Sequence, residues 1–283
     1  MKENGCEKLQ VECKKERFRV VTYNIHKCRG LDRRVRPARI AEVLGELNAD
    51  IIALQEVLAI EGKKPEDNQA RFIGDQLALD YRLGENRKIN EGAYGNVILS
   101  RLPFVSTYNY DLSHGDREPR GCLRADLKLR QNRVLHVYNV HLGTSYVERR
   151  NQARRLFDRR ILGNSGLTGA RIVLGDFNEW IRELASRLLS EHFGSADVRF
   201  YYGWSRTYPG VFPFLRLDRI YFDTSLVLER ATLHLSRTAL IASDHLPIVA
   251  DFHLGSTSST HGIKGHERKT GEDRDSVEID VMI

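Results

Sequence analysis

Short apolar segments with the pattern of β-strands recur along most of the chain, and helical patterns separate them only occasionally. Strands are predicted at residues 17–23, 50–57, 94–100, 122–129, 133–142, 171–177, 215–222, 226–235 and 247–254. Helices are predicted at residues 39–47, 68–79, 147–162 and 180–193. Because strands outnumber helices and several neighbouring strands are joined by short turns, the pattern predicts mixed sheets in two layers with helices outside.

One domain over residues 17–254 is predicted, because no linker-like stretch interrupts this region. Residues 1–16 are charged and lack periodicity, and residues 255–283 are first rich in Ser, Thr and Gly and then charged. Both ends are therefore predicted to be flexible tails.

Composition indicates a globular protein and argues against a disordered or membrane-spanning chain. The 283 residues are 41% hydrophobic and 29% charged, and no apolar run has the length of a membrane helix. The N-terminus lacks the apolar core of a signal peptide, and the four cysteines have no metal-binding spacing. We therefore expect a cytoplasmic protein with free thiols, which is most simply a monomer.

The net charge of +6 favours phosphate-rich partners, either nucleic acid or an anionic membrane surface. An ordinary solvated surface with some excess arginine explains the same charge equally well. Charge alone does not decide between these alternatives.

Polar residues follow the apolar runs at the ends of the predicted strands. They are Asn24, Glu56, His141, Asp176, Asn178, Asp218, Asp244 and His245. One such residue is most often a turn cap or a hydrogen-bonded core histidine. Eight of them at six strand segments predict a common site if the strand ends converge.

Carboxylate and amide oxygens are the ligands that Mg²⁺ or Mn²⁺ prefers over zinc. A carboxylate that accepts a proton from water, and a cationic imidazole that stabilises negative charge, suit the hydrolysis of a phosphate ester. The strand ends carry no obvious Ser or Cys nucleophile, and the sequence has no nucleotide-binding GxxxxGK[ST] loop.

Seven segments occur together in a characteristic order: VVTYNIH, IIALQEV, GNVILS, YNVHLG, VLGDFNEW, RLDRIYF and SDHLPIVADF. This set, which covers residues 18–254, resembles the endonuclease/exonuclease/phosphatase superfamily. The resemblance implies a four-layer α/β/β/α sandwich of two mixed sheets packed face to face, with helices outside and the site where strand ends of both sheets meet. Residues 207–222 are most similar to bacterial members encoded near cardiolipin synthases.

The resemblance also implies residue roles on the metal side of the site. Glu56 would be the principal Mg²⁺ or Mn²⁺ ligand, with Asn24 close by and Asp244 as a direct or water-mediated ligand. Asp176 would orient or deprotonate the attacking water.

Other roles concern the phosphate. Asn178 would contact the scissile phosphate, and Asp218 would hold His245 against a phosphate oxygen. His141 matches the histidine that pancreatic deoxyribonuclease and bacterial sphingomyelinases use near the leaving group. His26, where abasic-site endonucleases carry an acid or amide, argues against abasic-site specificity.

Three further signals remain open. Among Arg117, Arg120 and Arg124, we expect Arg120 to reach the site and bind phosphate, the alternative being an exposed hairpin. The arginine pairs at 149/150, 154/155 and 159/160 are predicted to form a solvated helix surface, the alternative being a phosphate-binding track. Trp204, Tyr208, Phe212 and Phe214 either form a lip that stacks on bases or touches lipid, or simply pack under a long loop.

The sequence thus predicts a metal-dependent phosphodiesterase that acts on nucleic acid or on a phospholipid headgroup, with peripheral contact to an anionic membrane as one option. A phosphomonoesterase acting on a sugar or inositol phosphate is the second reading. A non-catalytic phosphate-binding scaffold is the third, and the filled polar positions argue against it.

Overall fold

The protein is described here by a computed structural model that covers residues 16–62, 64–89, 92–196, 206–210 and 214–255. Two six-stranded sheets form its centre. The first has the order β11(Leu226–Leu233), β12(Ile248–Leu254), β1(Arg17–Asn24), β2(Ile51–Ala59), β4(Gly92–Ser100) and β3(Asp80–Ile89). The second has the order β5(Phe104–Asp111), β6(Gly121–Lys128), β7(Val134–His141), β8(Ala170–Asp176), β10(Asp218–Phe222) and β9(Gly194–Ser195).

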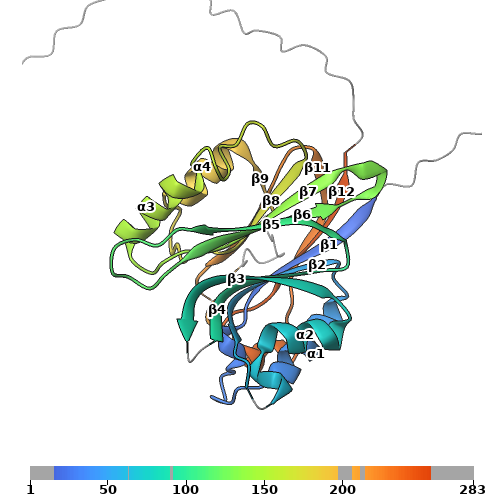
Figure 1. The fold of residues 1–283 in the computed structure, drawn as a ribbon, viewed down its shortest axis with the longest axis vertical. Helices are drawn as coiled ribbons and strands as arrows, with labels where there is room; N and C mark the ends of the chain where they lie inside the picture. Colours follow the sequence, from blue (N-terminus) through green and yellow to red (C-terminus); the bar gives the residue numbers. More distant parts are fainter. Residues whose placement is uncertain (1–15, 63, 90–91, 197–205, 211–213, 256–283) are drawn as a thin grey trace, which may run out of the picture.

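Both sheets are mixed, since β1 and β2 are parallel in one and β7 and β8 are parallel in the other. Within the described residues, the α-helices are α1(Pro37–Leu47), α2(Gln69–Leu77), α3(Tyr146–Leu156), α4(Leu184–His192) and the short α5(Ala239–Ala242). Figure 1 shows α1 and α2 outside the first sheet and α3 and α4 outside the second. The predicted four-layer sandwich is therefore confirmed.

Three apolar layers hold this arrangement together. Residues such as Ile51, Leu123 and Leu174 form the core between the sheets. Leu44 belongs to the layer between the first sheet and its helices, and Leu156 to the layer between the second sheet and α3. Strand alternation places one apolar set on each face of a sheet, so a sheet covered on both faces needs nearly continuous apolar strands.

The sequence pattern missed the two edge strands β3 and β5. Most of their residues are exposed or half-buried, so they lack the apolar run that marks the central strands. The pattern also missed the two-residue β9 and the four-residue α5.

Two helix predictions were wrong in their bounds. The helix predicted at 147–162 ends at Leu156, where the chain turns and the N–H of Leu162 returns to the carbonyl of Leu156. The helix predicted at 180–193 begins only at Leu184, because Glu179 and Glu183 in the preceding segment are drawn into buried ion pairs.

A buried amide network joins the two sheets directly below the site. Asn139 of β7 donates from Nδ2 to the carbonyl oxygens of Leu54 and Val97 in the first sheet, both at 2.9 Å. Gln55 of β2 returns a bond from Nε2 to Asn139 Oδ1 at 2.8 Å. Directional bonds between otherwise apolar faces fix how one sheet sits on the other.

We expect Asn139→Ala to lower the free energy of unfolding by about 2–4 kcal/mol, because it removes two buried bonds to the carbonyl groups of Leu54 and Val97 and the acceptor of Gln55 Nε2. Urea denaturation measures this loss. Asn109→Ala removes an exposed amide bond to the Glu85 carbonyl and should cost less than about 1 kcal/mol. Equal losses in the two variants would contradict a special role for the inter-sheet amide.

Candidate active site

The predicted site residues come from strand ends of both sheets. Asn24 ends β1, Glu56 lies in β2, His141 ends β7, Asp176 ends β8 and Asp218 begins β10. In the second sheet, Asp176 is the register partner of both His141 and Asp218. Ser243, Asp244 and His245 precede β12 in the first sheet. Parallel central strands ending at the same edge bring these side chains together.

The segment from Gly175 to Asn178 shows how local geometry aims the two polar side chains. A Cβ at Gly175 would lie 1.9 Å from the carbonyl oxygen of Val140, so only glycine allows β7 and β8 to approach here. Phe177 points into the core and meets Tyr221 edge to face at 5.6 Å. Asn178 has a left-handed φ of 50° and its N–H donates to Asp176 Oδ1 at 2.9 Å.

Glu56 reaches the site because β2 is irregular there. The register with β4 shifts between Leu54 and Val57, and Glu56 has a φ of 57°. Leu54 and Val57 both face the helix layer, which strict alternation would not allow for residues three apart. The extra residue in this bulge therefore releases Glu56 from both apolar layers.

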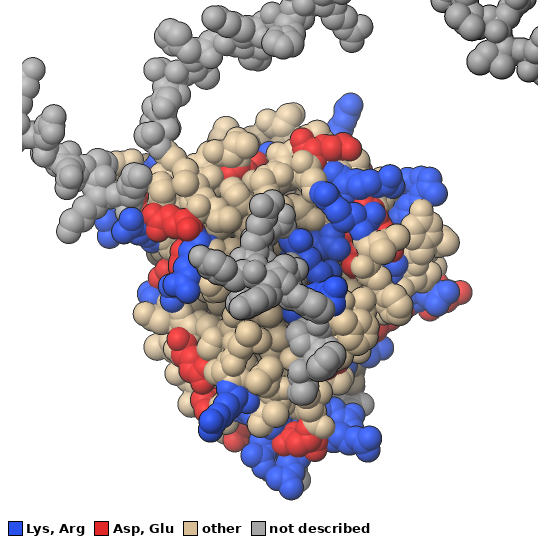
Figure 2. All heavy atoms as spheres, turned by 180° about the vertical axis from the view of Figure 1, so that it is seen from behind, with Lys and Arg blue, Asp and Glu red and all other residues tan. Residues whose placement is uncertain are grey.

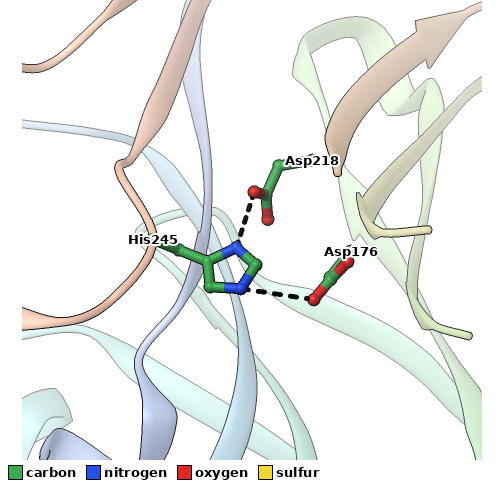
Figure 3. A group of neighbouring side chains, drawn as sticks. All are labelled: Asp176, Asp218 and His245. Carbon is green, nitrogen blue, oxygen red and sulfur yellow. Dashed lines mark hydrogen bonds and ion pairs between the residues drawn. The ribbon is translucent and has the colours of Figure 1, made fainter. Parts of the chain in front are cut away.

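His245 lies between two aspartates, as Figure 3 shows. Its Nδ1 is 2.8 Å from Asp218 Oδ2, and its Nε2 is 3.7 Å from Asp176 Oδ2. Burial disfavours the charged imidazole, but the negative charges of Asp218 and Asp176 outweigh this and raise the pKa of His245 to about 10. His245 is therefore an imidazolium at neutral pH.

Asp176 links the two sheets across the site. Its Oδ2 accepts a bond from Asn24 Nδ2 at 3.0 Å and lies 3.7 Å from His141 Nε2. Asn24 Nδ2 is also 3.3 Å from Glu56 Oε1. These contacts connect Asn24, Glu56, His141, Asp176 and His245 into one cluster, to which Asp218 is joined through His245.

His141 is fully enclosed and differs from His245 in charge. Burial and the neighbouring Arg120 lower the pKa of His141 to about 4, although Asp176 and Glu56 act in the opposite direction. Arg120 Nη1 is 3.1 Å from His141 Nδ1, and its Nη2 is 2.9 Å from Glu118. Arg120 thus lies at the site as expected, and His141 is neutral at pH 7.

Lys27 is a site residue that the sequence reasoning missed. Its Nζ is 2.8 Å from Glu56 Oε2. Burial acts to raise the pKa of Glu56, but the charge of His141, which is protonated at the low pH where Glu56 titrates, and the charge of Lys27 lower it to about 2. The position of Lys27, three residues after the strand-end Asn24, was the available signal.

The remaining predicted residues lie at the margin of this cluster. Asp244 is 27% exposed in its side chain and is 3.5 Å from His26 Nδ1. Asn178 donates from Nδ2 to the carbonyl of Leu142 at 2.9 Å. Of the arginines near Arg120, Arg117 is exposed, whereas Arg124 is buried and binds Asp126 through both Nε and Nη2.

The residues present fit a divalent cation. Asp176, Asp218 and His245 each offer a ligand atom, all within 4.8 Å of one another. Because His245 is protonated and bonded to Asp218, we regard it as a partner of that carboxylate and Glu56 as the better ligand. Asp218 Oδ1 is buried and has no hydrogen-bond partner among the described residues. The cluster holds the carboxyl groups of Glu56, Asp176 and Asp218, whereas of its cationic side chains Arg120 is paired with Glu118 and only Lys27 and His245 face these carboxyl groups.

Two buried ion pairs brace the loops around the site. Arg219 Nη1 is 3.3 Å from Glu179 Oε2, and its Nη2 donates to the Glu179 carbonyl. Arg149 binds both carboxylate oxygens of Glu183, at 2.8 and 2.6 Å. The prediction that every arginine of the three pairs is solvated was therefore wrong for Arg149. A bidentate carboxylate partner 34 residues away could not be read from spacing.

Of the four aromatic residues expected to form a lip, Trp204 and Phe212 lie outside the described residues. Tyr208 packs against His245, with ring centroids 5.0 Å apart. Phe214 is 54% exposed. Tyr208 therefore packs onto the site, while Phe214 projects outward.

With this geometry in place, the chain can be compared with known proteins. It matches the Endonuclease/Exonuclease/phosphatase family over residues 21–245. It is 33% identical over 249 residues to the uncharacterized protein YbhP of Escherichia coli K12, covering 84% of this chain and 96% of the relative. The chain belongs to the Endonuclease/Exonuclease/phosphatase family.

Solved structures share the fold at lower identity. A mannosyl-6-phosphatase of Bacteroides thetaiotaomicron has a TM-score of 0.68 at 19% identity, covering 83% of this chain and 99% of that one. The human Nocturnin catalytic domain, solved with a bound sulfate anion, has a TM-score of 0.66 at 20% identity, covering 84% and 95%.

We expect Asp218→Asn to lower the pKa of His245, because the amide supplies no negative charge to stabilise the imidazolium. His245 should lose its proton at a pH roughly 1–3 below the value of about 10 in the unaltered protein. An NMR titration of the imidazole carbon resonances measures this change. Asp223→Asn, which breaks the distant pair with Arg171, should leave the titration of His245 in place. An unchanged titration of His245 in Asp218→Asn would refute the conclusion that the charge of Asp218 keeps His245 protonated.

Proposed function

We propose that this protein is a divalent-metal-dependent hydrolase of phosphate esters that acts on phosphodiesters. The observation that carries the proposal is the set of contacts across both sheets, from Glu56 through Asn24 and Asp176 to His245. Membership of the Endonuclease/Exonuclease/phosphatase family supports the same reaction class.

Asp176 is the residue best placed to accept a proton from the attacking water. Its carboxylate is almost fully buried, and Asn24 and the Asn178 N–H hold both of its oxygens in position. A fixed carboxylate orients a water molecule for in-line attack at low entropic cost. The positive charge of nearby His245 compensates the buried negative charge of Asp176.

His245 and Arg120 are the cationic groups that would stabilise charge on the phosphoryl oxygens. Asp218 binds Nδ1 of His245 and stabilises the charged imidazolium. Nε2 of His245 points away from Asp218, toward Asp176. A preorganised donor of this kind contributes more in the transition state than in the ground state. Neutral His141, which Arg120 contacts, is suited to give or take a proton near the leaving group.

Glu56 and Asn24 would hold a Mg²⁺ or Mn²⁺ ion, with Asp244 near it. Such an ion, when bound, supplies positive charge that polarises the phosphoryl group. The Lys27 ammonium on Glu56 shows that this carboxylate accepts a cation at 2.8 Å.

A diester is favoured over a monoester by charge. Among the described residues at the site, Lys27 and Arg120 are already paired with Glu56 and Glu118. Because these two cations are already neutralised, the site offers little free positive charge to a bound phosphate. A monoanionic diester needs less compensation than a dianionic monoester and is therefore favoured.

The substrate class can be tested with soluble chromogenic esters and Mn²⁺. We expect hydrolysis of bis(p-nitrophenyl) phosphate to exceed that of p-nitrophenyl phosphate, and EDTA to abolish both. Preference for the monoester would support the phosphomonoesterase alternative instead. Lack of turnover on either ester, with Mn²⁺ bound, would support a phosphate-binding scaffold.

Glu56→Gln and Asp176→Asn should fail in different ways. Glu56→Gln should weaken Mn²⁺ binding, measured by isothermal titration calorimetry, by at least about tenfold. Asp176→Asn should keep Mn²⁺ binding while kcat falls roughly a hundredfold to ten-thousandfold, because the amide cannot take the proton of water.

Glu66→Gln and Asp75→Asn are matched controls at exposed positions and should match the unaltered protein in both measurements. Full turnover in Asp176→Asn, or unchanged Mn²⁺ affinity in Glu56→Gln, would refute the role proposed for that residue.

A further inference from the structure

Large apolar side chains that are exposed to solvent concentrate around the candidate active site. Among the described residues, eight of the twelve exposed large hydrophobic side chains lie on segments that directly follow or precede site residues. These eight are Leu31, Val35, Tyr146, Val147, Trp180, Ile181, Phe214 and Ile241, and we call them the rim. Exposed apolar residues scattered singly need no explanation, but a concentration at one edge does.

Two rim segments belong to the second sheet. Trp180 and Ile181, which are 70% and 73% exposed, follow Asp176, and Tyr146 and Val147, at 54% and 59%, follow His141. The buried pair of Arg149 and Glu183 ties these segments together. The protein therefore holds these apolar side chains outward, on the first turn of α3 and on the segment before α4, although folding alone would favour burying them.

Phe214 joins the same side of the rim. Arg219 donates from Nη2 to the carbonyl of Glu179 and also to the carbonyl of Arg216. One buried guanidinium thus connects the segment of Phe214 with the segment of Trp180. Arg149 and Arg219 therefore join the three segments on the second-sheet side of the site.

The other side of the rim belongs to the first sheet. The segment after Asn24 folds back on itself through a bridge between Arg29 and Val35. Leu31 donates from its N–H to the carbonyl of Ile241, which lies two residues before Ser243. Leu31, Val35 and Ile241 are 42%, 58% and 46% exposed.

Arginines accompany the apolar side chains on this border. Arg29, Arg33, Arg34 and Arg36 are exposed around Leu31 and Val35, and Arg150 and Arg182 are exposed on the other side. On the face in Figure 2, Lys and Arg side chains gather in several patches, with groups of Asp and Glu beside them and uncharged surface between. Apolar side chains mixed with cationic ones are the composition that binds anionic lipid surfaces.

We infer that the rim docks onto the surface of an anionic phospholipid bilayer and presents the active site to headgroup phosphates, an inference that rests on the proposed function for the choice of substrate. Trp180 and Tyr146 suit the interface between headgroups and acyl chains. Three rim residues carry rings on which a nucleic-acid base could stack, but the other five are aliphatic and suit acyl chains rather than bases. A symmetric contact with a second copy would bring arginine-rich borders against each other.

The full-length chain can be tested by sedimentation with vesicles of equal parts phosphatidylcholine and phosphatidylglycerol, in EDTA to prevent hydrolysis. We expect binding to these vesicles and little to pure phosphatidylcholine. Trp180→Ser combined with Ile181→Ser should weaken binding at least about tenfold, because less apolar surface enters the interface. Val105→Ser combined with Val227→Ser removes two exposed apolar side chains far from the site and should leave binding unchanged.

Charge is tested by Arg33→Glu combined with Arg34→Glu. This variant should bind the anionic vesicles roughly tenfold or more weakly, and added salt should weaken binding of the unaltered protein. Lys128→Glu combined with Arg130→Glu makes the same change in net charge at exposed positions at and beyond the end of β6 that is opposite the site, and should have a smaller effect. Equal losses in the two variants would indicate attraction by net charge and overturn the docking surface.

Insertion has its own spectroscopic signal, because Trp180 and Trp204 are the two tryptophans of the chain. In a Trp204→Phe variant, emission should shift to shorter wavelength when anionic vesicles are added. An absent shift would overturn insertion at Trp180.

Hydrolysis and docking can fail separately. Asp176→Asn should bind vesicles as the unaltered protein does, since docking needs no turnover. Hydrolysis of the soluble diester without vesicle binding would contradict membrane docking by the rim and would leave the proposed function standing. Vesicle binding without hydrolysis of any ester would contradict the proposed function and would leave docking standing. Binding of oligonucleotides without binding of vesicles would reject the bilayer as the partner of the rim. A dimer of the unaltered protein that is lost in the Trp180 and Ile181 double variant would also reject it.

Discussion

The buried amide bridge between Asn139, Gln55 and the backbone of the first sheet is the interaction on which the rest of the structure depends. Apolar contacts between the sheet faces have no preferred direction, so they allow one sheet to slide over the other. The directional bonds from Asn139 to two carbonyl groups do not allow such sliding. The bridge lies next to the bulge that aims Glu56, so the same bonds that hold the sheets in register also place the first sheet's carboxylate opposite Asp176 of the second.

Electrostatic balance explains why so many charges survive in the interior. A buried carboxylate without a partner costs free energy of folding. At this site each of two carboxylates has a cationic partner: Asp218 is paired with His245, and Glu56 is paired with Lys27. The same pairing separates two histidines of one sequence into different states. His245 is charged beside two aspartates, whereas His141 is neutral beside Arg120. Environment, not residue type, assigns their chemical roles.

The loops around the site combine rigid interiors with apolar exteriors. Buried pairs of Arg149 with Glu183 and Arg219 with Glu179 anchor the segments that present Trp180 and Phe214 to solvent. Loops built this way keep apolar side chains exposed without collapsing onto the core. The polar cluster of the candidate site and the exposed apolar side chains are therefore held by the same buried ion pairs. The start of α4 at Leu184 follows from these pairs, because Glu183 and Glu179 take part in them.

Sequence alone determined the two-sheet sandwich. Apolar periodicity, which is a local feature of the chain, predicted mixed sheets in two layers with helices outside, and the resemblance of seven segments to a known superfamily implied that the sheets pack face to face. The sequence also indicated eight of the polar residues that the fold gathers at one edge. Only tertiary structure decided which of them touch, since Asp176 meets Asn24 across 152 residues of chain and Glu56 turns inward through a bulge. The charges of His141 and His245, the place of Lys27 and the burial of Arg149 likewise depend on partners distant in sequence. Electrostatic and hydrogen-bond energies act through space, so periodicity along the chain carries no trace of them.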